Sequence, residues 1–161
     1  MKKIILFVCF FESLLFANPS PLGLELNKAT FEEVTQKYPK YKTKGLSKFS
    51  NGKVIYIEPR NAYPLGFAKV VFIFSQDDIL LSTVLDLKET TDIESSLDKK
   101  YKLIKSKKSS FDEAIYNSNE TEIILYRNDR LIYIHKDLIE LYNKVKNEEK
   151  IKNIKDNDNK L

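Results

Sequence analysis

Residues 67–87 constrain the fold of this chain more than any other segment, because two apolar runs are separated here by a short polar stretch. Residues 67–74 are apolar except for Lys69, and residues 79–87 form a second run rich in leucine, isoleucine and valine. The stretch between them, SQDD at residues 75–78, contains residue types that favour turns. Apolar runs that are too short for an ordinary helix and are bounded by turn residues are typical of strands buried on both faces. We therefore predict a β-hairpin at the centre of a sheet.

Residues 1–17 have the pattern of an export signal. Lys2 and Lys3 precede the apolar residues 4–11, and the small residue Ala17 comes before a polar, proline-containing stretch. A basic start, an apolar core and a small residue at the cleavage point describe a secretory signal peptide. The apolar segment is too short to cross a bilayer, which needs about 20 apolar residues. We predict cleavage after Ala17, with a retained N-terminal segment as the alternative.

The cysteine and charge contents limit the compartment and the chemistry of the mature chain. The only cysteine, Cys9, lies within the predicted signal, so the mature chain would have no disulfide, no thiolate nucleophile and no cysteine metal ligand. This combination suits a bacterial protein of the periplasm, or of the extracellular space beyond it, with no membrane span after signal removal. The formal net charge of +4 favours acidic partners without identifying a function.

Two capping-box patterns divide the rest of the chain into similar halves. The sequences TFEE at residues 30–33 and TDIE at residues 91–94 place a hydroxyl three residues before a carboxylate, as at a helix N-terminus. Apolar residues at helical spacing follow each box. Asn51-Gly52 is a strong signal for a hairpin turn in the first half. We predict a helix after each box, and strands at residues 41–49, 54–58, 67–74, 79–87, 101–107, 111–117, 121–127 and 130–136.

These elements are described most simply as two copies of a helix followed by four strands, at residues 27–88 and 89–136. Residues 59–66 are interpreted as a loop inserted in the first copy. A further helix is expected to begin near Lys136 or Asp137, and residues 148–161 are expected to form a charged flexible tail. The predicted fold class is α+β: residues 18–147 form a single domain in which helices back an antiparallel sheet, with a helix at its C-terminal end.

The hairpin pattern Phe74-x-x-Asp77-x-Ile79-x-x-x-x-Val84, within a repeat of cap, helix and hairpin, resembles a group of small bacterial envelope modules. These are the modules related to β-lactamase-inhibitor protein and to the SmpA/OmlA outer-membrane assembly lipoproteins. The resemblance covers residues from about 26 to 136. It implies an antiparallel sheet backed by helices that binds other proteins and catalyses nothing, and it does not imply which partner this chain has.

Few residues of this chain are suited to catalysis. His135 is the only histidine, and a role as general base or pH sensor is weighed against that of a structural or surface histidine. We favour a structural or surface histidine, because there is no second histidine for a metal site and no Ser-His-Asp spacing. Asp77-Asp78 could bind a cation, but aspartate is a common turn residue and adjacent strand residues point to opposite faces. The sequence therefore predicts no enzyme, no metal site and no cofactor.

Two surfaces are candidates for binding a partner. The loop at residues 59–66 is stiffened by two prolines and presents Arg60, Tyr63 and Leu65; in the alternative, Tyr63 or Leu65 folds back over the sheet end. The strand at residues 101–107 places Lys105 and Lys107 on one face; in the alternative, its lysines only protect a sheet edge from aggregation. For an exported protein, an acidic protein, an anionic glycan or an anionic lipid headgroup is a better partner than nucleic acid.

We therefore predict a non-enzymatic periplasmic protein-interaction module, in which the other face of the sheet or the loop docks an envelope protein. The alternative is a small binding domain for a hydrophobic or anionic ligand, held between sheet and helices in a pocket lined by Phe72, Phe74 or Tyr126. A hydrolase is the third hypothesis, and it requires His135 within hydrogen-bond reach of a serine or aspartate in a cleft.

Overall fold

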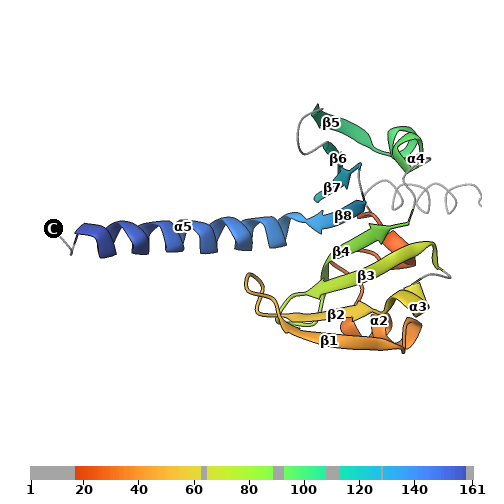
Figure 1. Cartoon of the computed structure of the whole chain (residues 1–161), viewed down its shortest axis with the longest axis horizontal. Coiled ribbons are helices and arrows are strands. Elements are labelled where there is room, and N and C mark those ends of the chain that lie inside the picture. Colours follow the sequence, from red (N-terminus) through yellow and green to blue (C-terminus); the bar gives the residue numbers. More distant parts are fainter. Residues whose placement is uncertain (1–16, 63–64, 89–92, 108–112, 128, 159–161) are drawn as a thin grey trace, which may run out of the picture.

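Within the described residues, 17–62, 65–88, 93–107, 113–127 and 129–158, the computed structural model contains one eight-stranded antiparallel sheet (Figure 1). Its strands are β1 (Tyr41–Leu46), β2 (Lys53–Ile57), β3 (Phe67–Phe74), β4 (Leu80–Leu87), β5 (Lys102–Lys107), β6 (Glu113–Ser118), β7 (Thr121–Tyr126) and β8 (Arg130–His135). They lie in the order β1-β2-β3-β4-β8-β7-β6-β5. The pairing of β4 with β8 at the middle of the sheet therefore joins the two halves of the chain.

The described helices are η1 (Pro21–Gly23), α2 (Phe31–Lys37), α3 (Pro59–Ala62), α4 (Ile93–Lys100) and α5 (Lys136–Asp158). The prediction of an α+β fold with an antiparallel sheet is confirmed. In each half a helix precedes four strands, α2 before β1 to β4 and α4 before β5 to β8, and the repeat relationship between the halves stays a prediction. Among the described residues, no helix combines the length and the apolar composition that a membrane crossing requires.

The hairpin predicted at residues 67–87 is formed by β3 and β4. Val71 pairs with Val84, and residues 75–78 form the turn. The amide of Ser75 donates to the carbonyl of Ile79 over 2.8 Å. Asp78 has a left-handed φ of 61°, a conformation that aspartate tolerates better than most residues. The interpretation of the two aspartates as turn residues is therefore confirmed.

Burial is one-sided along β3 and along the second half of β4, which corrects the prediction that both faces of the whole hairpin are covered; only residues 80–83, at the start of β4, are all buried. Phe72 is 0% exposed, whereas Val71 and Ile73, which point to the other face, are half-buried. The reason is that the helices of both halves pack on the same face of the sheet. Val34 of α2 and Leu97 of α4 belong to one core with the buried side chains of the strands. The other face, which we call the open face, carries apolar residues that neither helix covers.

The first predicted capping box begins α2. The hydroxyl of Thr30 accepts a hydrogen bond from the amide of Glu33 over 3.2 Å, and the Glu33 carboxylate accepts one from the amide of Thr30 over 2.7 Å. Both bonds satisfy backbone donors at the helix N-terminus. Residues 91 and 92 of the second predicted box lie outside the described residues, and α4 is described from Ile93.

Two segments differ from the prediction. Residues 59–66 were expected to be a loop, but they contain one helical turn, α3. Pro59 has the fixed φ of a first helical position, and the amides of Asn61 and Ala62 both donate to the carbonyl of Glu58 over 2.9 Å. Ala62 is 0% exposed, so the core holds this turn in place. At the other end of the chain, α5 continues as a helix to Asp158, where the sequence predicted a tail from residue 148.

The turn between β1 and β2, at residues 47–52, connects three parts of the fold. The hydroxyl of Ser50 donates to the carbonyl of Phe74 at the end of β3 over 2.6 Å. A Cβ added to Gly52 would lie 2.0 Å from that same carbonyl oxygen, so only glycine fits this close approach. Phe49 contacts Tyr142 of α5, with ring centroids 4.9 Å apart. The turn thus fixes β1 against both β3 and α5.

Replacing Gly52 tests this close approach. We expect Gly52→Ala to lower the free energy of unfolding by about 3 kcal/mol or to prevent folding, because backbone atoms cannot move aside as a flexible side chain can. Gly66→Ala is the matched control: Gly66 has a φ of 89° and no neighbour within 4 Å, so it should lose about 1 kcal/mol from backbone strain alone. Urea unfolding measures both losses, and equal losses would contradict the steric argument.

Candidate functional site

The open face carries a continuous row of apolar side chains that crosses the middle of the sheet. Its six members are directly paired across six neighbouring strands, and each is half-buried. We call this set the apolar row: Tyr56, Val71, Val84, Ile132, Ile124 and Ile115. Single apolar residues on a sheet surface are common and need no explanation, but an uninterrupted band of them is typical of a binding surface.

A second row on the same face is charged, and it lies next to the apolar row, two residues away along each strand. Lys69, Asp86 and Arg130 are paired in succession across β3, β4 and β8. The Arg130 guanidinium donates to the Asp86 carboxylate over 2.7 Å. On the outer strands, the ammonium group of Lys105 lies 3.7 Å from the carboxylate of Glu113. The apolar row therefore has a polar border, which is the usual organisation of a protein interface.

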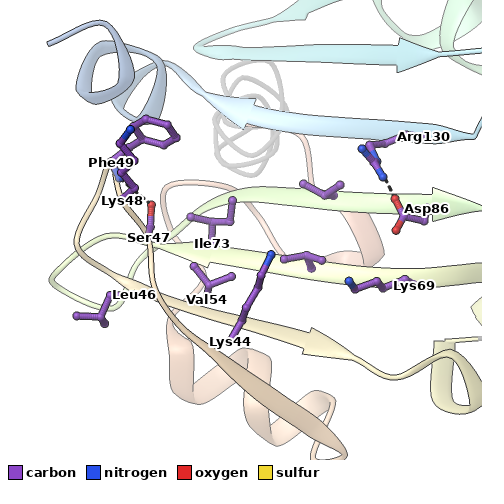
Figure 2. A pocket seen from close by; sticks show the side chains of 12 residues that line it. Lys44, Leu46, Ser47, Lys48, Phe49, Val54, Lys69, Ile73, Asp86 and Arg130 are labelled. Atoms are coloured by element: carbon purple, nitrogen blue, oxygen red, sulfur yellow. Dashed lines mark hydrogen bonds and ion pairs between the residues drawn. The ribbon is translucent and has the colours of Figure 1, made fainter. Parts of the chain in front are cut away.

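A groove of about 440 Å³ lies on the open face, where β1 and the turn at residues 47–52 form a wall over β2, β3 and β4 (Figure 2). We call it the lysine groove. Its floor is aliphatic and consists of Val54, Val71, Ile73 and Val84. Its wall consists of Lys44, Leu46, Ser47, Lys48 and Phe49, and Lys69, Asp86 and Arg130 lie along the opposite side.

Two of the cations that line the lysine groove have no ion pair among the described residues. Lys48 lies 2.8 Å from Glu149 of α5, and Arg130 is engaged by Asp86. Neither Lys44 nor Lys69 has a carboxylate within ion-pair distance in the described part of the chain, and the Lys69 ammonium lies 5.1 Å from the centroid of the Tyr56 ring. The groove thus combines an apolar floor with an excess of positive charge. An anionic group next to an apolar group is the chemistry that fits it.

A second cavity, of about 310 Å³, lies between α4, the N-terminal segment and the covered face of the sheet. Its lining is mostly apolar and includes Phe67, Leu97, Tyr101 and Tyr133. The pocket that the sequence predicted was to be lined by Phe72, Phe74 or Tyr126, and none of these residues lines this cavity. The physical reason is that the two phenylalanines are 0% exposed in the core, and that Tyr126, which pairs with Arg130, faces the open side of the sheet.

The structure does not bring the predicted interaction residues together. Tyr63 lies outside the described residues. Arg60 is exposed on α3, and Leu65, which is 37% exposed, lines a small cavity beside Tyr38. Lys105 is exposed on β5, at the opposite edge of the sheet from β1, while Lys107 pairs with Glu113 in register and its side chain is not described. The loop and the lysine strand are therefore separate surfaces, and neither belongs to the lysine groove.

His135 is buried, so of the two predicted alternatives, a structural or a surface histidine, the surface one is wrong. Its side chain is 0% exposed, and its Nδ1 accepts a hydrogen bond from the amide of Asp137 in the first turn of α5 over 3.3 Å. The carboxylates of Glu120 and Asp137 each lie 3.4 Å from an imidazole nitrogen. Carboxylates are therefore close, but the imidazole ring itself is fully buried. Among the described residues, no three His, Cys, Asp or Glu side chains are grouped as metal ligands would be.

We expect the free energy of unfolding to fall at high pH because of two buried tyrosines. Burial, followed by the hydrogen bond to Asp98, raises the pKa of Tyr116, and burial, followed by the interaction with Tyr101, raises the pKa of Tyr133. Because both hydroxyls keep their protons in the folded state, the stabilisation is complete below the ordinary tyrosine pKa of about 10. It is lost as the pH rises from there toward the folded-state values.

The double variant Tyr116→Phe/Tyr133→Phe tests this. Urea unfolding between pH 8 and pH 11 should give a shallower fall in the free energy of unfolding than the unsubstituted protein shows. Identical slopes would mean that these hydroxyls do not retain their protons.

The sequence prediction named the uncovered face of the sheet as one possible docking surface, but it assigned no residues to that face. The uninterrupted apolar run in β3 was interpreted as burial on two sides, whereas half of its side chains lie on a face that α2 and α4 leave uncovered. The chain matches no family model, no curated protein and no solved structure, so the resemblance to envelope modules stays a prediction.

Proposed function

We propose that this protein is a non-enzymatic interaction module of the bacterial envelope, which binds a partner protein through the open face of its sheet. The observation that carries this proposal is the apolar row. Six directly paired apolar side chains, all half-buried, cross the middle of the sheet on the face that α2 and α4 do not cover. Burial of such a band against a partner supplies the hydrophobic contribution to binding.

The dimensions of the apolar row favour a protein over a small ligand. Neighbouring strands lie about 4.8 Å apart, so five steps from β2 to β6 span about 24 Å. A stable protein interface covers about 800 Å² on each partner, and a band of this length with its charged border fits within that area. A small molecule would leave most of the band exposed. The border of Lys69, Asp86, Arg130 and Glu113 supplies charges that can select among partners.

A second candidate function is a binding domain for a hydrophobic or anionic ligand. The cavity of about 310 Å³ beside α4 supports it, because this cavity lies between a helix and the sheet and has Lys100 at its lining together with apolar side chains. A cavity of this size suits a small ligand. A ligand that stays bound to the purified protein and shifts the NMR signals of Leu97 and Tyr133, but not those of Ile124, would favour this function.

Export to the periplasm is part of the first proposal, and the predicted signal supports it. The residues that follow the predicted cleavage point belong to the fold: the Asn18 side chain lies 3.4 Å from the Thr121 hydroxyl, and Pro19 is buried. We expect the protein isolated from a periplasmic extract to begin at Asn18. Mass spectrometry of the intact protein checks this, and a chain that keeps Met1 in the membrane fraction would contradict it.

Photocrosslinking in intact cells tests the docking face. A photoreactive residue, p-benzoylphenylalanine, replaces Ile124 in the apolar row, and the matched control carries it at Gln36, an exposed position on α2. We expect Ile124 to capture one envelope protein in a light-dependent way and Gln36 to capture none. A second position, Ile132, should capture the same protein, because it pairs directly with Ile124. Equal capture at Gln36, or none at Ile124 and Ile132, would contradict the proposed function.

A further inference from the structure

We infer that the lysine groove binds an acidic segment of the partner protein, with a carboxylate between Lys44 and Lys69 and a neighbouring apolar side chain on the aliphatic floor. This inference deepens the proposed function and depends on it, because it names the chemistry of the segment that the open face recognises. Three observations carry it: the pairing of Asp86, the bulge in β1, and the recessed position of the floor.

The first observation concerns Lys69. Its cross-strand neighbour is Asp86, which would normally neutralise it. The Asp86 carboxylate accepts instead from the Arg130 guanidinium on the other side, over 2.7 Å. Lys69 is left half-buried, with the Tyr56 ring 5.1 Å away and no carboxylate within ion-pair distance in the described structure. The charge of Lys69 therefore has no partner beside the groove, and an incoming carboxylate can form the ion pair that Asp86 does not form.

The second observation concerns Lys44. Thr43 pairs with Ile55 and Gly45 pairs with Val54, so Lys44 is the extra residue of a β-bulge. Bulges redirect side chains, and here Lys44 extends from β1 over the floor toward β3 (Figure 2).

Gly45 permits this arrangement. Its φ is 117°, a value that other residues rarely adopt, yet nothing lies within 4 Å of the position of an added Cβ. Glycine is therefore needed for the shape of the bulge and not for space. The bulge brings an unpaired lysine over the same floor that Lys69 borders.

The third observation distinguishes a protein segment from a membrane. A surface that binds a bilayer inserts protruding apolar side chains into it. Here Val54, Val71, Ile73 and Val84 are half-buried at the bottom of the groove, below exposed Lys44. Among the apolar residues that line the groove, only Leu46, which is 70% exposed, protrudes. Lysines present point charges with no fixed geometry, which suits carboxylates on a flexible segment. The floor also continues into the apolar row through Val71 and Val84, so the same partner can cover both.

Peptide binding tests the chemistry directly. The probe is a fluorescein-labelled acidic hexapeptide, Glu-Leu-Glu-Leu-Glu-Leu, and its counterpart has lysine in place of glutamate. We expect the mature protein to bind only the acidic peptide. The double variant Lys44→Glu/Lys69→Glu should weaken that binding by about tenfold or more. The variant Lys28→Glu/Lys40→Glu, which changes the net charge equally at exposed lysines outside the groove, should bind normally.

Two controls complete the peptide experiment. Circular dichroism and urea unfolding should show that the charge-reversed protein is folded; if it is not, Lys44→Gln/Lys69→Gln replaces it, with a weakening of at least threefold expected. Equal binding of both peptides, or equal binding by the two double variants, would overturn the inference. Sedimentation with vesicles of phosphatidylglycerol and phosphatidylethanolamine that depends on Lys44 and Lys69, without peptide binding, would assign the groove to lipid and overturn it as well.

Crosslinking at Ile124 separates failure of this inference from failure of the proposed function. If the Lys44→Glu/Lys69→Glu variant captures the same partner to the same extent, the protein binds this partner without recognising an acidic segment, and only the inference is overturned. A different result would overturn the proposed function but not the groove chemistry. In that result, the protein with Lys44 and Lys69 intact binds the acidic peptide but captures no partner. Loss of capture in the groove variant but not in Lys28→Glu/Lys40→Glu supports both.

Discussion

The placement of the helices on one face of the sheet is the constraint on which the rest of this structure depends. An eight-stranded sheet has two faces to satisfy, and α2 and α4 both pack on the face of Phe72. That face is a conventional hydrophobic core. On the opposite face, β-branched residues suited to strands remain half-buried. The fold therefore contains an apolar surface that α2 and α4 do not cover, and the charged row and the lysine groove border that surface.

Local signals allowed much of the fold to be predicted from the sequence. The capping box at Thr30, the turn at residues 75–78 and the alternation along the strands depend on residues close together in the chain. The strand order depends on contacts between distant residues, and no local pattern indicates that β4 pairs with β8. The helical turn α3 was missed for a related reason: Ala62 is buried by the rest of the fold, which outweighs the tendency of a two-proline segment to form a loop.

The candidate site was harder to predict than the fold. Tyr63 and the lysines of β5 were chosen because each is conspicuous in its own segment. The groove depends instead on two features of the folded chain. A bulge redirects Lys44, and the Asp86 carboxylate, which faces Lys69, accepts from Arg130. No sequence motif indicates the position of the bulge or the choice of Arg130 as the partner of Asp86. The uncovered face of the sheet was predicted as a docking surface, but no residues were assigned to it. The continuous apolar run in β3 was interpreted as burial on both sides, because strands covered on both sides have the same composition.

The strand order also has a kinetic consequence. In the described sheet, strands that pair are neighbours along the chain, except at β4 and β8, where Ser82 pairs with Ile134. The local hairpins close short loops, whereas this pairing closes a loop that contains the second half of the chain, and such closure is slow because it costs more chain entropy. The two halves are thus expected to collapse first and to join last. Until they join, β4 and β8 are both unprotected edges beside an uncovered apolar face, so the folding intermediate is the species most prone to aggregate.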